Sequence, residues 1–219
     1  MTMLKLHGFA ASNYYNKVKL ALIEKHIAFE EVLQWADGSA ALLAASPLGK
    51  IPYLETEHGF ISETQAISGY LEAKFPEHPL MPADSYAAAK VREIIAFTDL
   101  YLEWEARRTY GWAFFGGSPD EAVNLQVAAR LGKAVPALTK LLRLAPFAAG
   151  STFTLADCAL AVHLPLVGLA GKVALGRDVY AGTPLKDYIA MLGERPAVQR
   201  VNADRKLNSE LLLAARAKV

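Results

Sequence analysis

The hydrophobic pattern of the chain changes near Pro82, and this change limits the possible folds more than any other feature. Before Pro82, short segments of alternating or mixed polarity are separated by glycine and proline turns. After it, apolar residues recur about four positions apart over residues 87–108 and 121–143, without alternation. The sequence therefore predicts a small α/β domain over residues 1–81 and an all-helical domain over residues 87–219.

The α/β part is predicted to contain two strands joined by a helix, then a short helix, two short strands and a final helix. Alternation of strand and helix at its start implies a parallel crossover. The expected strands lie at residues 3–9, 28–33, 52–54 and 59–61, and the expected helices at 14–25, 39–45 and from Gln65 to Phe75. The three lysines of the first helix, Lys17, Lys19 and Lys25, are expected on its solvent face.

Two pairs of residues have the spacing of a capping box, in which a side chain at each end satisfies a free helix amide. Ser62 with Gln65 predicts the start of the last helix of the α/β part, and Thr154 with Asp157 predicts another helix start. Pro136 lies inside the predicted helix 121–143, and it is expected to kink or split that helix because proline lacks a backbone donor. Shorter helices are expected at 185–192 and 197–201.

Composition excludes several classes of function. The 23 basic and 22 acidic residues give a net charge of +1, which supplies no field for collecting nucleic acid or anionic membrane. The N-terminus lacks the apolar run of a signal peptide, and no stretch of about 18 apolar residues is expected to span a membrane, so a cytoplasmic location is predicted. The single cysteine, Cys158, allows no internal disulfide, no CxxC motif and no cysteine-rich metal site.

Five segments, in this order and spacing, resemble those of the cytosolic glutathione transferase family, and the resemblance covers nearly the whole chain. They are Ser12 with Lys17-Val18, Pro47-Leu48-Gly49-Lys50-Ile51-Pro52, Glu63-Thr64-Gln65-Ala66-Ile67, Thr154-Leu155-Ala156-Asp157, and Arg195-Pro196-Ala197-Val198. The resemblance implies a thioredoxin-like N-terminal domain and an all-helical C-terminal domain. It also implies a homodimer and glutathione as co-substrate, with no metal.

The resemblance implies a glutathione site built from two segments. A cis bond before Pro52 would turn the backbone of Ile51 outward, so that it pairs with the cysteinyl residue of glutathione as an added strand would. Lys50 is expected to contact the glycyl carboxylate, or else to be simply solvated. Glu63 and Thr64 precede a helix whose free amides favour an anion, and they would hold the γ-glutamyl end of the ligand. Without this resemblance, Pro52 would merely start a strand and the other two residues would merely cap a helix.

Ser12 is the candidate catalytic residue implied by the resemblance, and it lies in the loop between the first strand and the first helix. A free thiol with a pKa of about 8.5 is only a few per cent ionised at neutral pH, whereas the nucleophile is the thiolate. A hydroxyl that donates to sulfur, helped by helix amides, stabilises the thiolate. Asn13 or Tyr14 remains an alternative donor.

The second substrate is expected to bind between the loop after the first strand and the first long helix of the helical domain. Aromatic residues suit an apolar electrophile, and Arg108 would suit an acidic one. An aromatic stripe is also compatible with a core or a dimer interface. The candidate substrate residues are Phe9, Tyr14, Tyr101, Trp104 and Arg108.

The predicted function is that of a glutathione S-transferase, in which the activated thiol of bound glutathione attacks a small electrophile. One alternative is a glutathione-dependent cis-trans isomerase, which adds the same thiolate reversibly. Another is a non-catalytic regulatory protein of the same fold that binds a protein partner. A disulfide reductase is disfavoured because the site lacks a protein thiol.

Overall fold

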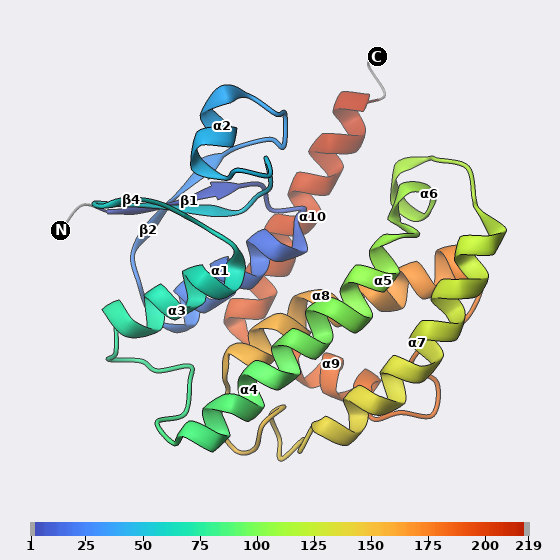
Figure 1. Cartoon of the computed structure of the whole chain (residues 1–219). Coiled ribbons are helices and arrows are strands. Elements are labelled where there is room, and N and C mark those ends of the chain that lie inside the picture. Colours follow the sequence, from blue (N-terminus) through green and yellow to red (C-terminus); the bar gives the residue numbers. More distant parts are fainter. Residues whose placement is uncertain (1–2, 217–219) are drawn as a thin grey trace. The chain divides into compact units, whose positions relative to one another are not determined.

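The computed structural model describes residues 3–216, with side chains described as far as residue 210. By their contacts, the residues form two compact units, Met1–Leu80 with Arg195–Val219, and Met81–Glu194. The elements in chain order (Figure 1) are β1 (Leu4–Gly8), α1 (Asn13–Glu24), β2 (Phe29–Leu33), α2 (Ala40–Ala45), β3 (Tyr53–Thr56), β4 (Gly59–Ser62), α3 (Thr64–Lys74), α4 (Ser85–Phe97), the π-helical turn η1 (Thr98–Glu103), α5 (Trp104–Arg107), α6 (Tyr110–Phe115), α7 (Glu121–Leu141), α8 (Leu155–Leu175), α9 (Leu185–Gly193) and α10 (Pro196–Arg216).

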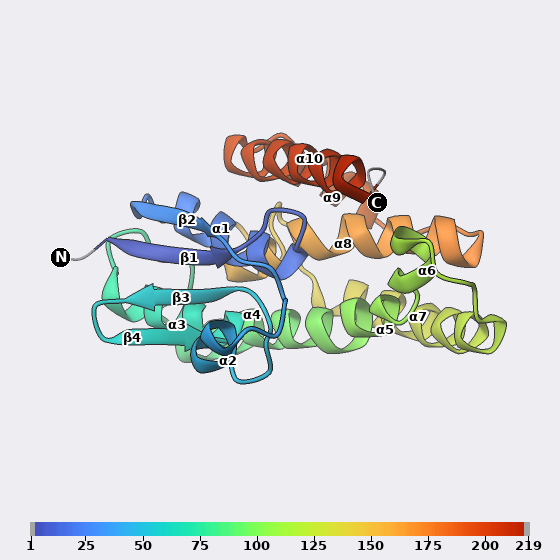
Figure 2. The ribbon, with the colours of Figure 1, turned by 90° about the horizontal axis from the view of Figure 1, so that it is seen from above.

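The first unit is built on a four-stranded sheet with the order β2-β1-β3-β4. β1 and β2 are parallel, as the strand-helix-strand pattern predicts, whereas β3 pairs antiparallel with both β1 and β4. Figure 2 shows these strands side by side. The thioredoxin-like N-terminal domain and the helical C-terminal region expected from the sequence are both present.

The two faces of the sheet are covered by different helices, with α1 and α3 on one face and α2 on the other (Figure 1). Because side chains alternate along a strand, Leu6 and Leu54 enter the core beneath α1 and α3, together with Val18 and Ile67. Tyr53 points to the opposite face, where it joins a smaller cluster with residues of α2. Burial on both faces fixes the register, since a slip of one residue would move each side chain to the opposite face of the sheet.

The two lysines of α1 and the lysine at its C-cap are buried, which corrects the expectation that they face solvent. Lys17, Lys19 and Lys25 are only 3%, 1% and 3% exposed. The ammonium of Lys19 contacts the carboxylates of Glu31 at 2.6 Å and Asp204 at 2.8 Å. That of Lys25 contacts a carboxylate of α3 and a backbone carbonyl. These partners compensate the desolvation that an unpaired ammonium would suffer.

The C-terminal helix α10 groups with the first unit and runs beside α1 (Figures 1 and 2). The sequence predicts a helix over only 197–201, but the observed helix begins at Pro196 and continues to Arg216. Arg195, just before it, donates two hydrogen bonds to the carboxylate of Glu24, at 3.0 and 2.7 Å. Ion pairs with residues of α1 therefore help to stabilise this helix.

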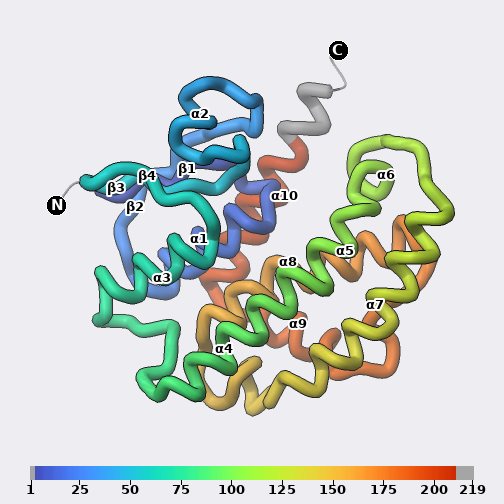
Figure 3. The backbone as a smooth tube through the Cα atoms, viewed as in Figure 1, coloured from blue at the N-terminus to red at the C-terminus, as the bar shows by residue number. Residues whose placement is uncertain are grey.

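The second unit is all-helical. α4, η1 and α5 follow one another without a break (Figure 3), so the predicted helix over 87–108 is confirmed in extent. It contains a π-helical turn that no local pattern indicates. α7 also continues through Pro136, so of the two expected outcomes, a kink or a split, the split is wrong. Val135 and Leu138, on either side of this proline, are fully or almost fully buried, and their packing maintains the helix.

α8 lies at the centre of the second unit, and the capping box predicted at its start is present between Thr154 and Asp157. Among the described helices, α8 alone is long and apolar enough to cross a membrane by length and composition, which corrects the expectation that no such stretch exists. Half of its most apolar window is buried inside the structure, as in the core helix of a globular domain.

Candidate active site

The register of the sheet brings three of the predicted segments to one end of it. His7 lies opposite Tyr53, and Tyr53 lies opposite Ser62. Because β3 is antiparallel to its two neighbours, the chain leaves β1, enters β3 and leaves β4 at this same end. We call it the site end. The Ser12 loop, Ile51-Pro52 and Glu63-Thr64 all follow directly from it.

Ser12 is the N-cap residue of α1. Its Oγ accepts a hydrogen bond from the backbone N–H of Tyr15 at 3.3 Å, and its own N–H donates to the carbonyl of Phe9 at 3.0 Å. A serine hydroxyl has one donor and two acceptor lone pairs. The capping bond uses one lone pair and leaves the hydroxyl hydrogen available to another acceptor. Ser12 can therefore cap the helix and donate at the same time.

Tyr15 is not a second candidate donor, because its hydroxyl is already committed. It is 2% exposed, and its O–H donates to a carboxylate oxygen of Glu31 at 2.7 Å. Burial, followed by the nearby Glu31 carboxylate, raises the pKa of Tyr15 far above its usual value. Tyr14 is half-buried instead, with the ammonium of Lys17 5.8 Å from its ring centroid. The structure leaves Asn13 and Tyr14 open as alternative donors.

The peptide bond between Ile51 and Pro52 is cis. The Ile51 side chain packs against the cluster of Leu42, Ala45 and Tyr53. This contact attaches the segment before β3 to α2. Lys50 is exposed. The preceding turn places Gly49 at a φ of 63°, where the absence of a β-carbon is favourable.

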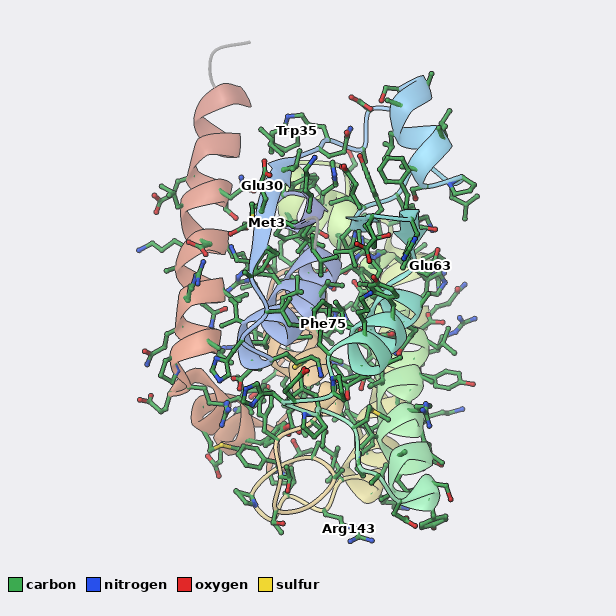
Figure 4. The ribbon with its side chains drawn as sticks, turned by 90° about the vertical axis from the view of Figure 1, so that its left-hand side faces the viewer. Met3, Glu30, Trp35, Glu63, Phe75 and Arg143 are labelled. Carbon is green, nitrogen blue, oxygen red and sulfur yellow. The ribbon has the colours of Figure 1, made fainter. Side chains whose placement is uncertain are left out.

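Glu63 occupies an unusual backbone conformation at the start of α3. Its φ of 69° and ψ of 120° lie outside the regions that side chains normally allow. It is the N-cap residue of α3, and no side chain caps that helix, so the predicted Ser62–Gln65 capping box is wrong. Ser62 ends β4 instead, because pairing with Tyr53 keeps it in the sheet. Figure 4 labels Glu63 where α3 begins.

The start of α3 presents the features of an anion site. The first amides of a helix have no partner within the helix, and the helix dipole places partial positive charge there. Thr64 is the first residue of α3 and is 7% exposed. Its carbonyl accepts from the hydroxyl of Ser68 at 2.7 Å, which rigidifies the first turn. A carboxylate bound here would meet both free amides and a threonine hydroxyl.

Trp35 also belongs to this part of the molecule, although it is not among the residues predicted from the sequence. β2 ends at Leu33, opposite Gly8, so the chain leaves β2 at the site end. The rings of Trp35 and Phe9 are 4.9 Å apart, and Trp35 is 40% exposed. Figure 4 labels Trp35. No local pattern identifies it, because its position depends on strand pairing.

The remaining candidate residues lie in the second unit. Tyr101 and Trp104 are large aromatic side chains that are 54% and 53% exposed. The guanidinium of Arg108 donates to Glu105 at 3.2 Å and to Gln126 at 2.9 Å. Its five N–H donors are not exhausted by these two contacts. Within the residues that the structure describes, no group of three or more His, Cys, Asp or Glu could hold a metal ion.

Glu55 on β3 contacts two residues of β1, Lys5 and His7. A carboxylate oxygen of Glu55 contacts Lys5 Nζ at 3.0 Å, and the other contacts His7 Nε2 at 2.8 Å. Hydrogen bonds from Lys5 and His7 lower the pKa of Glu55. His7 also stacks on the ring of Tyr53 at 4.4 Å. These contacts link β1 to β3 near the site end.

Comparisons with known proteins bear on the family and the fold. The glutathione S-transferase N-terminal domain family matches residues 6–79. A glutathione S-transferase from Pseudomonas putida is 42% identical, with 93% of each chain covered. The crystal structure of glutathione transferase F7 from Populus trichocarpa superposes with a TM-score of 0.77 at 25% identity, covering 93% of this chain and 99% of that one. A maleyl pyruvate isomerase described as a zeta-class bacterial glutathione S-transferase superposes with a TM-score of 0.72 at 27% identity, covering 90% and 95%. The chain belongs to the glutathione S-transferase family.

Proposed function

We propose that this protein binds glutathione at the site end of the sheet and activates its thiol for attack on an electrophilic small molecule. The observation that carries the proposal is the convergence of the Ser12 loop, Ile51-Pro52 and Glu63-Thr64, through the register of β1, β3 and β4. Each segment can bind a different part of glutathione.

In this proposal, the γ-glutamyl carboxylate binds the free amides and the hydroxyl at Thr64, while Glu63 lies near the ammonium. The unusual backbone of Glu63 supports this role, because strained conformations in proteins concentrate at functional sites. The backbone of Ile51 pairs with the cysteinyl residue as an added strand would. Lys50, which is exposed, makes a charge contact with the glycyl carboxylate.

Ser12 then donates its hydroxyl hydrogen to the sulfur. The bond from Tyr15 N–H to Ser12 Oγ supports this assignment, because it orients the hydroxyl without using its hydrogen. Lowering a thiol pKa by about two units requires about 2.7 kcal/mol of preferential stabilisation of the thiolate. A charge-assisted hydrogen bond together with the N-terminal dipole of α1 is of that size.

For the second substrate, we assign the apolar contacts to Phe9, Tyr14, Tyr101 and Trp104, and a charge contact with an acidic substrate to Arg108. The exposure of Tyr101 and Trp104 supports this choice, because buried core aromatics could not touch a ligand. The assignment predicts that Trp104→Ala raises the KM for an apolar electrophile and leaves glutathione affinity unchanged.

We further propose that the protein is a cytoplasmic homodimer. Family membership supports both statements. Sedimentation velocity of the purified chain is expected to give a mass near twice 23.7 kDa. A species that remains at the monomer mass across the accessible concentration range would contradict the dimer.

A second candidate reaction is glutathione-dependent cis-trans isomerisation of a double bond by reversible addition of the same thiolate. The structural similarity to a maleyl pyruvate isomerase favours it over other reactions. An assay of a cis-unsaturated diacid, with glutathione present and absent, distinguishes isomerisation from conjugation, because only conjugation consumes glutathione.

The decisive experiment titrates glutathione into the wild-type protein and into Ser12→Ala while the ultraviolet absorbance of the thiolate is followed against pH. The wild type is expected to bind glutathione and to lower the thiol pKa by about two units from its free value. Ser12→Ala should bind it with most of that shift lost. No binding by the wild type would leave a non-catalytic protein of this fold. Binding with an unshifted thiol in both proteins would contradict the role of Ser12.

A further inference from the structure

The loop that carries Ser12 is attached to the C-terminal helix. The backbone N–H of Ala11, which directly precedes Ser12, donates to Oδ1 of Asn208 at 2.9 Å, across 197 residues of sequence. Two other hydrogen bonds of this loop are local. Asn16 Nδ2 donates to the carbonyl of Ala10 at 2.7 Å, and Ser12 N–H donates to the carbonyl of Phe9. Asn208 therefore supplies the distant contact that ties this loop to α10.

Asn208 is held in place by the packing of α10 on α1. Asp204 lies one helical turn before Asn208, so the two side chains share a face of α10. The carboxylate of Asp204 contacts the ammonium of Lys19 at 2.8 Å, and Lys19 is only 1% exposed. A buried lysine that lost this carboxylate would be left under-compensated. This ion pair therefore fixes the position of α10 along α1, and with it the position of Asn208.

A second connection leads from the same helix to the Ser12 hydroxyl. Lys19 also contacts Glu31 at 2.6 Å, and Glu31 accepts from the hydroxyl of Tyr15 at 2.7 Å. Tyr15 in turn donates its backbone N–H to Ser12 Oγ. The backbone before Ser12 is thus attached to α10 directly, through Asn208. Tyr15, whose N–H donates to the Ser12 hydroxyl, is attached to α10 through Glu31, Lys19 and Asp204.

We propose that Asn208 is a positioning residue for thiol activation, which acts by holding the Ala11 amide so that the Ser12 hydroxyl points at the sulfur of glutathione. The inference rests on the function proposed above for Ser12. Small errors of alignment matter here, because the strength of a hydrogen bond falls steeply with angle and because displacements of about 1 Å can cost about a hundredfold in rate. Without Asn208, the Ala11 amide would seek another partner and the loop would move with it.

The test compares two substitutions at one position. Asn208→Leu has a similar size but removes the acceptor, whereas Asn208→Asp keeps an oxygen acceptor in the same place. Asn208→Leu is expected to raise the pKa of the bound glutathione thiol by about one unit, a tenfold loss of thiolate below that pKa. It should lower kcat more than it raises the KM for glutathione. Asn208→Asp should recover most of both losses.

The control is Ser209→Ala, which removes a hydroxyl that donates to the carbonyl of Arg205 within α10. It perturbs the same turn of the helix without touching the Ser12 loop, so the thiol pKa should stay at the wild-type value. Amide hydrogen exchange at Ala11 gives a readout that does not depend on activity. Exchange should accelerate in Asn208→Leu and remain slow in Asn208→Asp and Ser209→Ala.

The possible results separate this inference from the proposed function. If Asn208→Leu keeps the wild-type thiol pKa and kcat while Ser12→Ala loses them, Ser12 acts as proposed and Asn208 has no positioning role. If the wild type does not lower the thiol pKa, both proposals fail. Should Asn208→Leu not fold, as judged by circular dichroism, Asn208→Ala makes the same test with a smaller side chain. A thiol pKa in Asn208→Ala equal to that of the wild type would overturn the inference.

Discussion

At the scale of single residues, Gly8 is a position in the sheet with no room for a side chain. A β-carbon at this position would lie 2.5 Å from Cδ2 of Tyr15 and 3.4 Å from Cδ1 of Ile51. Its φ of 150° also disfavours any side chain. Both neighbours belong to the site, since the Tyr15 N–H donates to Ser12 Oγ and Ile51 leads into β3. A residue without a side chain therefore allows these two segments to meet.

We expect Gly8→Ala to lower the free energy of unfolding by about 1–3 kcal/mol, through overpacking and backbone strain. Chemical denaturation measures this change. Gly59→Ala is the matched control, because Gly59 has a φ of 121° but open space around its β-carbon position. Equal losses in the two variants would mean that the contact with Tyr15 costs nothing.

Thr64 tests the proposed anchor for the γ-glutamyl carboxylate. Thr64→Val removes the hydroxyl and keeps the shape, so glutathione is expected to bind at least about tenfold more weakly, the value of one hydrogen bond to a charged group. Thr64→Ser keeps the donor and should bind within about twofold of the wild type. Isothermal calorimetry measures both affinities. Wild-type affinity in Thr64→Val would exclude the hydroxyl from the site.

At the scale of elements, the capping carboxylates of different helices differ in how many partners they bind. Asp157 in α8 is fully buried. One of its oxygens accepts from the N–H of Ala148 at 2.8 Å and from the hydroxyl of Tyr188 at 2.5 Å, and the other accepts from Thr154. Burial, with the neighbouring carboxylate, raises the pKa of Tyr188 far above its usual range, so Tyr188 remains a donor at every physiological pH. This cap joins α8, α9 and the loop before α8.

Asp157→Ala is expected to lower the free energy of unfolding by about 3 kcal/mol or more, because it leaves several buried donors without an acceptor. Asp84→Ala is the comparison. Asp84 caps α4 with one exposed bond to the N–H of Ala87, so its loss should cost about 1 kcal/mol. Thermal or denaturant unfolding of both variants provides the measurement. Similar losses would show that the wider network around Asp157 adds no stability.

At the scale of the whole molecule, acid should weaken ion pairs in both units. Hydrogen bonds from Lys5 and His7 lower the pKa of Glu55 in the first unit, and a hydrogen bond from Lys186 lowers that of Asp178 in the second. A lowered pKa means that the folded state binds the proton more weakly than the unfolded state. The stability that these pairs contribute is therefore complete above the unfolded pKa and disappears as the pH falls through the folded value.

Glu55→Gln is expected to be less stable than the wild type at neutral pH, by the small amount typical of exposed ion pairs. The difference should shrink as the pH falls below about 4, near the ordinary pKa of a glutamate. Denaturant unfolding at a series of pH values measures it. Glu210→Gln, which changes an exposed carboxylate of α10, is the control. A difference that grew on acidification would contradict the assigned direction of the pKa shift.

The sequence by itself determined the order and type of most elements, together with the capping box of α8 and the segments of the proposed glutathione site. These features depend on contacts three or four residues apart, or on a resemblance that lies in short segments. Local patterns also misled at Ser62, which pairing with Tyr53 keeps in β4, and at Pro136, where the packing of α7 prevails over the missing donor.

Only the tertiary structure decided how those segments become a site. The register of β1, β3 and β4 brings Ser12, Ile51 and Glu63 to one end of the sheet, and strand pairing adds Trp35. Lys19 and Lys25 are buried because their carboxylate partners arrive from β2, α3 and α10. Asn208 contacts Ala11 because α10 packs against α1. Such contacts join residues far apart in the chain, so their energies are set by how the elements pack and leave no trace in local sequence spacing.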